Sequence, residues 1–114
     1  MNFTFKKYNL IFGWIAFAVA LVTYTLTLEP TVSFWDCGEY ISTSVKLEVG
    51  HPPGAPLYQM LGAFFAMFAK DATQIAYMAN FMSALSSAFT ILFLFWTISI
   101  LAQKVLLKKD EVLN

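Results

Sequence analysis

Two carboxylates and a histidine lie close together in the stretch FWDCGEYISTSVKLEVGHPPGAPLY, residues 34–58. Asp36 and Glu39 have the spacing of one helical stripe, and His51 is the only histidine in the chain. A carboxylate placed beside a hydroxyl group can act as a general base when that hydroxyl attacks another group. The alternative interpretation is structural, with Asp36 as a helix-start carboxylate, Glu39 as a solvated surface group and His51 as a hydrogen-bonded corner residue. No cysteine and histidine spacing of the zinc type accompanies them.

The composition that surrounds these residues is that of a membrane protein. Hydrophobic residues make up 59% of the 114 residues, aromatic residues 18% and charged residues only 12%, which is outside the range of soluble domains. All seven basic residues are lysines and seven acids balance them, so no basic cluster indicates a nucleic-acid partner. Cys37 is the only cysteine, which excludes a disulfide within the chain.

Two uncharged stretches, residues 10–28 and 75–102, are long enough to cross a bilayer as helices. The first is longer than a typical signal-peptide core, so we interpret it as a retained anchor and not as a cleaved signal. Lysines precede the first stretch and follow the second, while acids outnumber lysines in the connection. Because positive residues mark the cytoplasmic side, this predicts that both termini are cytoplasmic and that residues 29–74 lie on the outer face.

The connection is expected to form two short helices. The first, over residues 33–50, would have Ser33 as its N-cap, Asp36 completing a capping-box pattern and Gly50 at its C′ position. Its apolar face, which includes Phe34, lies apart from a polar stripe, as in helices at a membrane surface. The second, over residues 55–69, is apolar on all sides and too short to span a bilayer. The predicted fold is an all-α membrane protein, a single membrane segment over residues 1–114 with two transmembrane helices joined by an amphipathic interfacial helix and a short apolar re-entrant or interfacial helix.

Small and polar side chains recur along one face of the second predicted span and, more weakly, along the first. This pattern is typical of close helix packing with interhelical hydrogen bonds. We therefore expect the spans to pack against each other or against further helices. The residues are Ala76, Asn80, Ser83, Ala84, Ser87 and Ala88 in the second span and Gly13, Ala16 and Ala20 in the first.

Two motifs follow each other in the connection, WDCGEY at residues 35–40 and HPPGAPLY at residues 51–58. A first span, an outer acidic motif behind an aromatic residue, a His-Pro-Pro corner and a further span in this order resemble the amino-terminal part of GT-C superfamily membrane glycosyltransferases, as in protein O-mannosyltransferases. The sequence is most similar to a bacterial multispanning family related to a eukaryotic protein O-mannosyltransferase. Because members of that family are several times longer, the resemblance implies an amino-terminal piece of a larger protein, in the bacterial inner membrane.

The resemblance also implies roles for individual residues. Asp36 occupies the position of the base that acts on the acceptor hydroxyl, in an inverting transfer of a sugar from a polyprenyl-phosphate donor. Glu39 departs from the adjacent Asp-Glu pair of the mannosyltransferases and is a possible supporting residue, as is His51, which would shape the site. The aromatic residues of the motifs, Trp35, Tyr40 and Tyr58, are expected to bind substrate, although Trp35 and Tyr40 would also suit interfacial anchors. No residue is assigned to a metal, and dependence on a divalent metal stays open.

The chain lacks arginine, whereas stabilisation of a leaving phosphate usually needs cations or a metal. We therefore expect the chain to be inactive alone, with membrane lipid and either the remaining transmembrane helices of the same protein or a membrane partner as its neighbours. The alternative is a non-catalytic two-span subunit that binds a partner through its outer helices. An ion-conducting pore is disfavoured because neither predicted span contains an ionisable acid or base.

Overall fold

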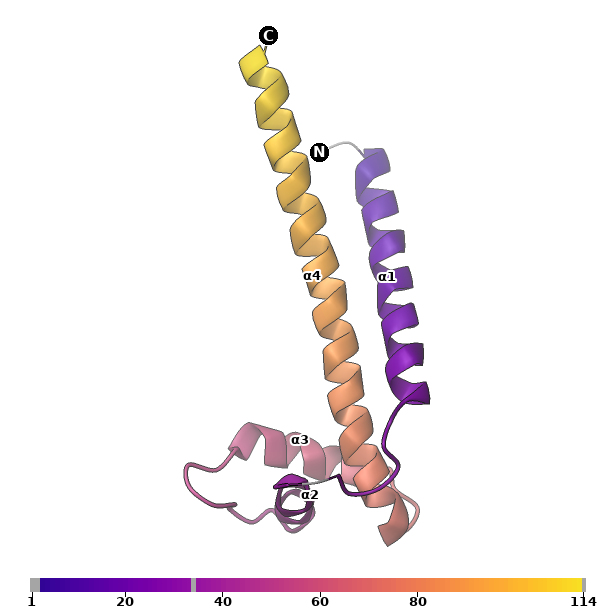
Figure 1. Cartoon of the computed structure of the whole chain (residues 1–114), viewed down its shortest axis with the longest axis vertical. Coiled ribbons are helices and arrows are strands. Elements are labelled where there is room, and N and C mark those ends of the chain that lie inside the picture. Colours follow the sequence, from indigo (N-terminus) through magenta and orange to yellow (C-terminus); the bar gives the residue numbers. More distant parts are fainter. Residues whose placement is uncertain (1–2, 34, 114) are drawn as a thin grey trace. The chain divides into compact units, whose positions relative to one another are not determined.

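A computed structural model describes residues 3–33 and 35–113. These residues form four α-helices, α1 (Phe3–Leu26), α2 (Cys37–Lys46), α3 (Pro56–Ala66) and α4 (Ile75–Leu113), and one 3-10 helix, η1 (Ala72–Gln74) (Figure 1). No strand occurs among them, which confirms the prediction of an all-α fold for the described part of the chain.

Residues 10–26 of the first predicted span lie in α1, which ends two residues earlier than predicted, and the second predicted span lies within α4. Both helices are long and apolar enough to cross a membrane. With 24 residues, α1 extends about 36 Å at 1.5 Å per residue, more than the roughly 30 Å of a hydrocarbon core. It ends at Leu26, shortly before Pro30, whose ring lacks an N–H and disfavours helix in the preceding residue. No glycine or proline interrupts α4, so it continues beyond the predicted end at residue 102.

The chain divides into two compact units. The first unit comprises Met1–Thr23 and Ser86–Asn114, and the second comprises Tyr24–Leu85. In the first unit Gly13 is buried, and a Cβ atom added there would overlap the indole ring of Trp96. The Trp96 indole N–H donates to the Asn9 carbonyl at 3.1 Å, and the Ser99 hydroxyl donates to the Asn9 side-chain oxygen at 2.6 Å. The small-residue face of α1 thus lets an aromatic ring of α4 approach its backbone.

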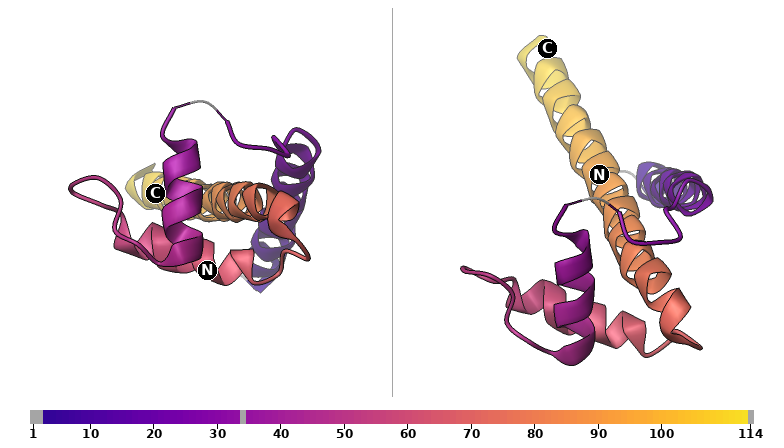
Figure 2. Two further views of the ribbon diagram at one scale, coloured as in Figure 1. Left: turned by 90° about the horizontal axis from the view of Figure 1, so that it is seen from below. Right: turned by 60° about the horizontal axis from the view of Figure 1, so that its bottom comes forward.

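In the second unit α2 lies across α3 (Figure 2). Gly62 of α3 is buried against Ser44 of α2, and a Cβ atom added to Gly62 would lie 2.7 Å from the Ser44 hydroxyl oxygen. Another face of α2 contributes Ile41 to a small apolar cluster with Ala76 and Ala79 at the start of α4. These contacts fix the position of α2 within the unit.

The segment that follows α1 is held by a residue of the predicted small and polar face. The side-chain amide of Asn80 donates to the carbonyl oxygens of Glu29 at 2.9 Å and Thr31 at 3.1 Å. Asn80 therefore fixes the segment that leads from α1 to α2.

The ends of α2 differ from the predicted ones. The N-cap is Asp36 and not Ser33, and its side chain makes no capping hydrogen bond. The helix stops after Lys46, where Leu47 adopts the left-handed conformation with φ 53°. The N–H groups of Leu47 and Glu48 bond back to the carbonyls of Ser44 and Thr43, which is the Schellman arrangement. This local closure ends the helix before Gly50, so the expected C′ role of Gly50 was wrong. The expected role of Phe34 lies outside the described residues.

The helix α3 starts with Pro56, a favourable first helical residue because its missing N–H has no partner there anyway. Its 11 residues extend about 16 Å, well short of a bilayer core. Its outward face is strongly apolar, since Leu57 and Met60 are 71% and 66% exposed, and Met67, which follows the helix directly, is 80% exposed. Whether this helix is interfacial or re-entrant stays a prediction.

Candidate functional site

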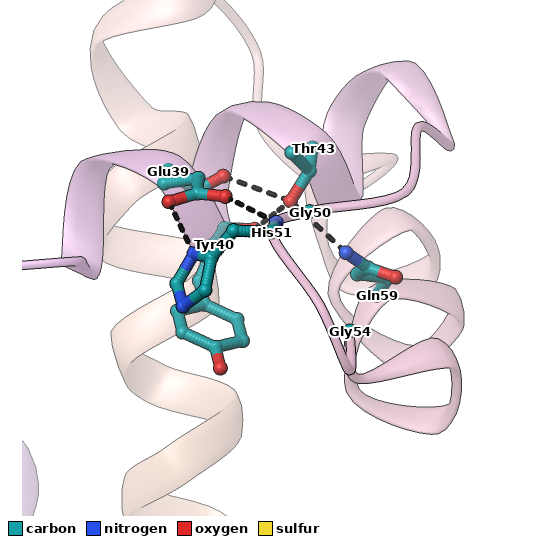
Figure 3. Close-up of a pocket in the computed structure, with 7 residues that line it drawn as sticks. All are labelled: Glu39, Tyr40, Thr43, Gly50, His51, Gly54 and Gln59. Atoms are coloured by element: carbon teal, nitrogen blue, oxygen red, sulfur yellow. Dashed lines mark hydrogen bonds and ion pairs between the residues drawn. The ribbon is translucent and has the colours of Figure 1, made fainter.

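The turn at residues 51–54, called the corner below, precedes α3. Glu39 of α2 binds this corner through both of its carboxylate oxygens (Figure 3). Oε1 accepts the backbone N–H of His51 at 2.7 Å, and Oε2 lies 2.8 Å from Nδ1 of the His51 ring. One side chain therefore fixes both the backbone and the ring orientation of His51. The corner itself is closed by the Gly54 N–H, which donates to the His51 carbonyl at 2.9 Å with Gly54 at φ 75°. A side chain is disfavoured at that φ, which explains glycine at this position.

A second set of contacts supports Glu39 from α3. The Gln59 side-chain amide donates to the Thr43 hydroxyl at 3.2 Å, and that hydroxyl donates to the Glu39 carbonyl at 2.8 Å. Gln59 is only 6% exposed, so its hydrogen bond is made in a largely dry environment, where an unpaired amide would be costly. Gly50 leaves room for these groups, because a Cβ atom there would lie 3.2 Å from Glu39 Oε1 and 3.3 Å from Gln59 Nε2.

Glu39 and His51 each shift the pKa of the other. The hydrogen bond from the His51 backbone N–H, followed by that from its ring, lowers the pKa of Glu39. The hydrogen bond to Glu39, followed by its negative charge, raises the pKa of His51, and the charge of Asp36 adds to this. The arrangement therefore favours a carboxylate beside an imidazolium. It is the one ion pair among the described residues.

Two tyrosines extend the site from the histidine into α3. The rings of Tyr40 and His51 lie 6.5 Å apart, and Tyr40 meets Tyr58 edge to face at 5.4 Å. Burial raises the pKa of the Tyr58 hydroxyl. The structure thus brings together Glu39, Tyr40, His51 and Tyr58 among the residues that the sequence singles out.

Trp35 and Asp36 lie just before the first residue of α2, and neither lines the cavity beside Glu39 and His51. The side chain of Asp36 is exposed, while its backbone carbonyl accepts the Tyr40 N–H at 3.0 Å. Trp35 is 94% exposed and has φ 69°, a conformation that costs a residue with a side chain about 1–2 kcal/mol. The roles predicted for these two residues stay predictions, as do those of the clustered ones.

The cavity between α2, α3 and the corner is small. It measures about 10 Å³, room for roughly one water molecule, and is lined by Glu39, Tyr40, Thr43, Gly50, His51, Gly54 and Gln59. A sugar does not fit there, so a substrate would have to bind on the exposed side of the cluster. Within the described residues, no three acidic, histidine or cysteine side chains lie close enough to hold a metal.

The sequence interpretation missed Thr43 and Gln59. Gln59 did carry a signal, because it is the only amide in the apolar stretch PLYQMLGAFFAMFA and such a residue on a buried helix needs a polar partner. Thr43 belongs with Asp36 and Glu39 to the polar stripe that the sequence predicts on this helix, yet it is only 8% exposed. Its partner Gln59 could not be foreseen without knowing that α3 lies against α2.

Comparison with known families decides the identity of this arrangement. Residues 36–114 match the family described as the protein O-mannosyl-transferase TMEM260 N-terminal domain. The chain belongs to this family. The matched segment begins at Asp36 and includes Glu39 and His51, so the acidic residues and the corner all belong to the family domain. The resemblance inferred from the two motifs is thereby confirmed: the chain corresponds to the amino-terminal part of O-mannosyltransferase-like integral membrane proteins.

Two curated relatives carry the same name. The protein O-mannosyl-transferase tmem260 of Dictyostelium discoideum is 31% identical over 94 residues, which is 82% of this chain and 12% of the relative. The protein O-mannosyl-transferase TMEM260 of Mus musculus is 33% identical over 82 residues, 72% of this chain and again 12% of the relative. The chain therefore spans about an eighth of these relatives. No solved structure matches the chain. Both relatives are eukaryotic, so the expected bacterial origin has no support from them.

Proposed function

We propose that the chain forms the amino-terminal part of a membrane glycosyltransferase that moves a sugar from a polyprenyl-phosphate donor to a hydroxyl group, with inversion at the anomeric carbon. Membership of the TMEM260 amino-terminal family supports this proposal, because the named relatives are protein O-mannosyl-transferases. The chain supplies the base that acts on the acceptor. Since it lacks arginine, further cations or a metal come from elsewhere in the active protein, and the chain alone is inactive.

Asp36 acts as the base in this proposal, and the observation that carries it is the contrast between the two acids. Both oxygens of Glu39 are occupied by His51, whereas the carboxylate of Asp36 is exposed and makes no capping bond. Asp36 is thus free to accept the proton of an acceptor hydroxyl while that oxygen bonds to the anomeric carbon. Glu39 and His51 hold the corner in place, as supporting residues.

The remaining aromatic residues divide by exposure. Trp35 presents an open ring beside Asp36 and is suited to contact a sugar or the acceptor. Tyr40 and Tyr58 contact each other and bound the site on the side of α3. The charge pattern supports an outer position for this face, with both termini in the cytoplasm, so in this proposal the base meets acceptors on the side of the membrane away from the cytosol.

Asp36→Asn in the full-length protein tests the proposal. The variant keeps the size of the side chain and removes the base, so transfer from a polyprenyl-phosphate sugar should fall by about 10²–10⁴-fold while membrane insertion is unchanged. Glu48→Gln is the matched control, because Glu48 is an exposed acid just beyond α2. Wild-type transfer rates in Asp36→Asn would remove Asp36 from the mechanism.

The exposed apolar face of α3 favours a second candidate, a non-catalytic membrane subunit that binds a partner through its outer helices. Under that candidate the full-length protein transfers no sugar from any polyprenyl-phosphate donor, and polar substitutions of Met60 and Met67 release a co-purifying membrane protein. Robust transfer by the purified full-length protein would exclude this candidate.

A further inference from the structure

The proposed transfer creates charge on the donor phosphate. As the acceptor oxygen bonds to the anomeric carbon, the bond from that carbon to the phosphate oxygen breaks and its electron pair stays on the phosphate. The phosphodiester monoanion becomes a monoester dianion, while the acceptor proton moves to Asp36. A hydrogen-bond donor aimed at that phosphate stabilises the transition state more than the ground state.

We propose that His51, held by Glu39, is a phosphate-binding residue that donates its Nε2 hydrogen to the phosphate of a lipid-linked donor. The inference rests on the function proposed above. Nδ1 of His51 is engaged by Glu39 at 2.8 Å, and the backbone N–H is engaged at 2.7 Å. The second ring nitrogen therefore has a fixed direction, on the side of the ring away from Glu39 (Figure 3). It makes no hydrogen bond to any described residue, and 54% of the side chain is exposed.

The protonated form of the His51 ring is suited to binding an anion. A carboxylate at one ring nitrogen favours the imidazolium form, in which both nitrogens carry hydrogen. The acids that act on the ring are Glu39 and, less strongly, Asp36, both from α2, and Tyr40 lies beside it. From α3 the same pocket receives Gln59, which is uncharged. Among the described residues no cation acts on His51, so none opposes its protonation, and its pKa is raised.

Other cations of the connection are less well placed. Lys46 and Lys70 are the only lysines in residues 29–74, and both are exposed. Neither belongs to an ion pair within the described part of the chain. A flexible ammonium group loses more side-chain entropy on binding than the ring of a residue that Glu39 already holds through its backbone and one ring nitrogen.

The surroundings also suit the lipid part of the ligand. The helix α3 begins at Pro56, shortly after the corner, and its first outward side chains are Leu57 and Met60, which are 71% and 66% exposed. An isoprenoid chain along this face would bury apolar surface while its phosphate meets His51. The charged group and the apolar face together select a phosphate that carries a prenyl chain.

Binding of methyl farnesyl phosphate to the full-length protein in phosphatidylcholine nanodiscs tests the inference. This phosphodiester keeps one charge across neutral pH, so its own titration does not interfere. Wild type should bind it about tenfold more tightly near pH 6 than near pH 8.5, because the protonated ring is lost as the pH rises. His51→Gln should bind about tenfold more weakly near pH 6 and lose the pH dependence. It keeps the backbone N–H that binds Glu39, so the corner retains one of its two bonds.

Two further variants sharpen the result. Glu39→Gln removes the charge that favours the imidazolium, so the loss of binding should shift to lower pH. Glu48→Gln, the exposed control, should behave as wild type. Dimethyl phosphate, which lacks the prenyl chain, should bind far more weakly than the farnesyl diester. Equal affinity for both would overturn the assignment to a lipid-linked phosphate.

Equal binding by wild type and His51→Gln near pH 6 would overturn the phosphate role itself. That outcome is separable from a failure of the proposed function, since transfer is measured on the same preparations. A wild-type protein that binds the diester through His51 but transfers no sugar would keep the phosphate site and remove the transferase. If the wild-type protein transfers sugar but His51→Gln binds the diester as tightly as wild type, the transferase function is kept and the phosphate site is removed.

Discussion

The contact between Gly62 and Ser44 allows a quantitative test of how α2 is held on α3. A Cβ atom at position 62 would lie 2.7 Å from Oγ and 2.9 Å from Cβ of Ser44, both far inside van der Waals contact. Ser44 is 2% exposed, so it has little room to move. Overpacking of this kind costs about 1–3 kcal/mol, whereas alanine gains about 1 kcal/mol over glycine in a helix. Gly62→Ala should therefore destabilise the α2 and α3 pair by about 1 kcal/mol.

A double variant, Gly62→Ala/Ser44→Gly, separates the free-energy cost of the steric overlap from the change in helix propensity. Ser44→Gly removes both atoms that the new Cβ would meet, at a cost of about 0.5 kcal/mol because serine lies between alanine and glycine in helix propensity. In Gly62→Ala/Ser44→Gly the overlap is absent and the two propensity changes offset each other to within about 0.5 kcal/mol. The double variant should return close to wild-type stability, with a coupling energy of about 1–3 kcal/mol in a double-mutant cycle.

Cys37 provides the assay, because it is the only cysteine of the chain and is partly buried against the Ile41 cluster. Its labelling rate by a maleimide reports how often α2 opens, and each 1.4 kcal/mol changes that rate by about tenfold. Gly62→Ala should label about fivefold faster than wild type. Gly38→Ala is the control, since a Cβ there meets Val32 Cγ1 at an ordinary 3.4 Å. Additive effects, within about 0.5 kcal/mol, would refute the close contact between Gly62 and Ser44.

Three further predictions test other contacts. Gly13→Ala should separate α1 from the Trp96 ring and lower the thermal stability of the first unit, with partial recovery in the double variant with Trp96→Ala; unchanged stability would contradict the overlap at Gly13. Asn80→Ala removes two hydrogen bonds, each worth about 0.5–1.5 kcal/mol, and should speed proteolysis after α1, whereas equal cleavage would show that the segment is held otherwise. The stability that the Glu39 carboxylate gives to the contact with His51 is lost as the pH falls below the ordinary pKa of 4.5 and through the lowered one. The stability that the protonated His51 ring gives is lost as the pH rises above 6.5 through the raised pKa. Protection of the His51 amide from hydrogen exchange should therefore be greatest between these two values. Flat protection across this range would contradict the ion pair.

Much of the fold follows directly from the sequence. The uncharged runs determined that α1 and α4 would be helices fit to cross a membrane, because such runs can satisfy their backbone only within a helix. Pro30 indicated the break after α1, and the two motifs predicted the family. Short-range signals were weaker at the ends of α2. Ser33 and Gly50 suited caps, but the helix begins after Asp36 and ends before Leu47, where backbone hydrogen bonds to Ser44 and Thr43 close its last turn.

The candidate site depended on the tertiary structure. Sequence spacing identified Asp36, Glu39 and His51 as the residues able to do chemistry, but not that Glu39 would be occupied by the backbone and ring of His51. That distinction, which leaves Asp36 free, arises because the corner turns back onto α2, and Gln59 contributes only because α3 lies against the same helix. Contacts between residues far apart in the chain depend on the path of the intervening backbone, and composition and periodicity do not encode that path. The sequence alone determined which groups were available; the fold decided which of them are paired.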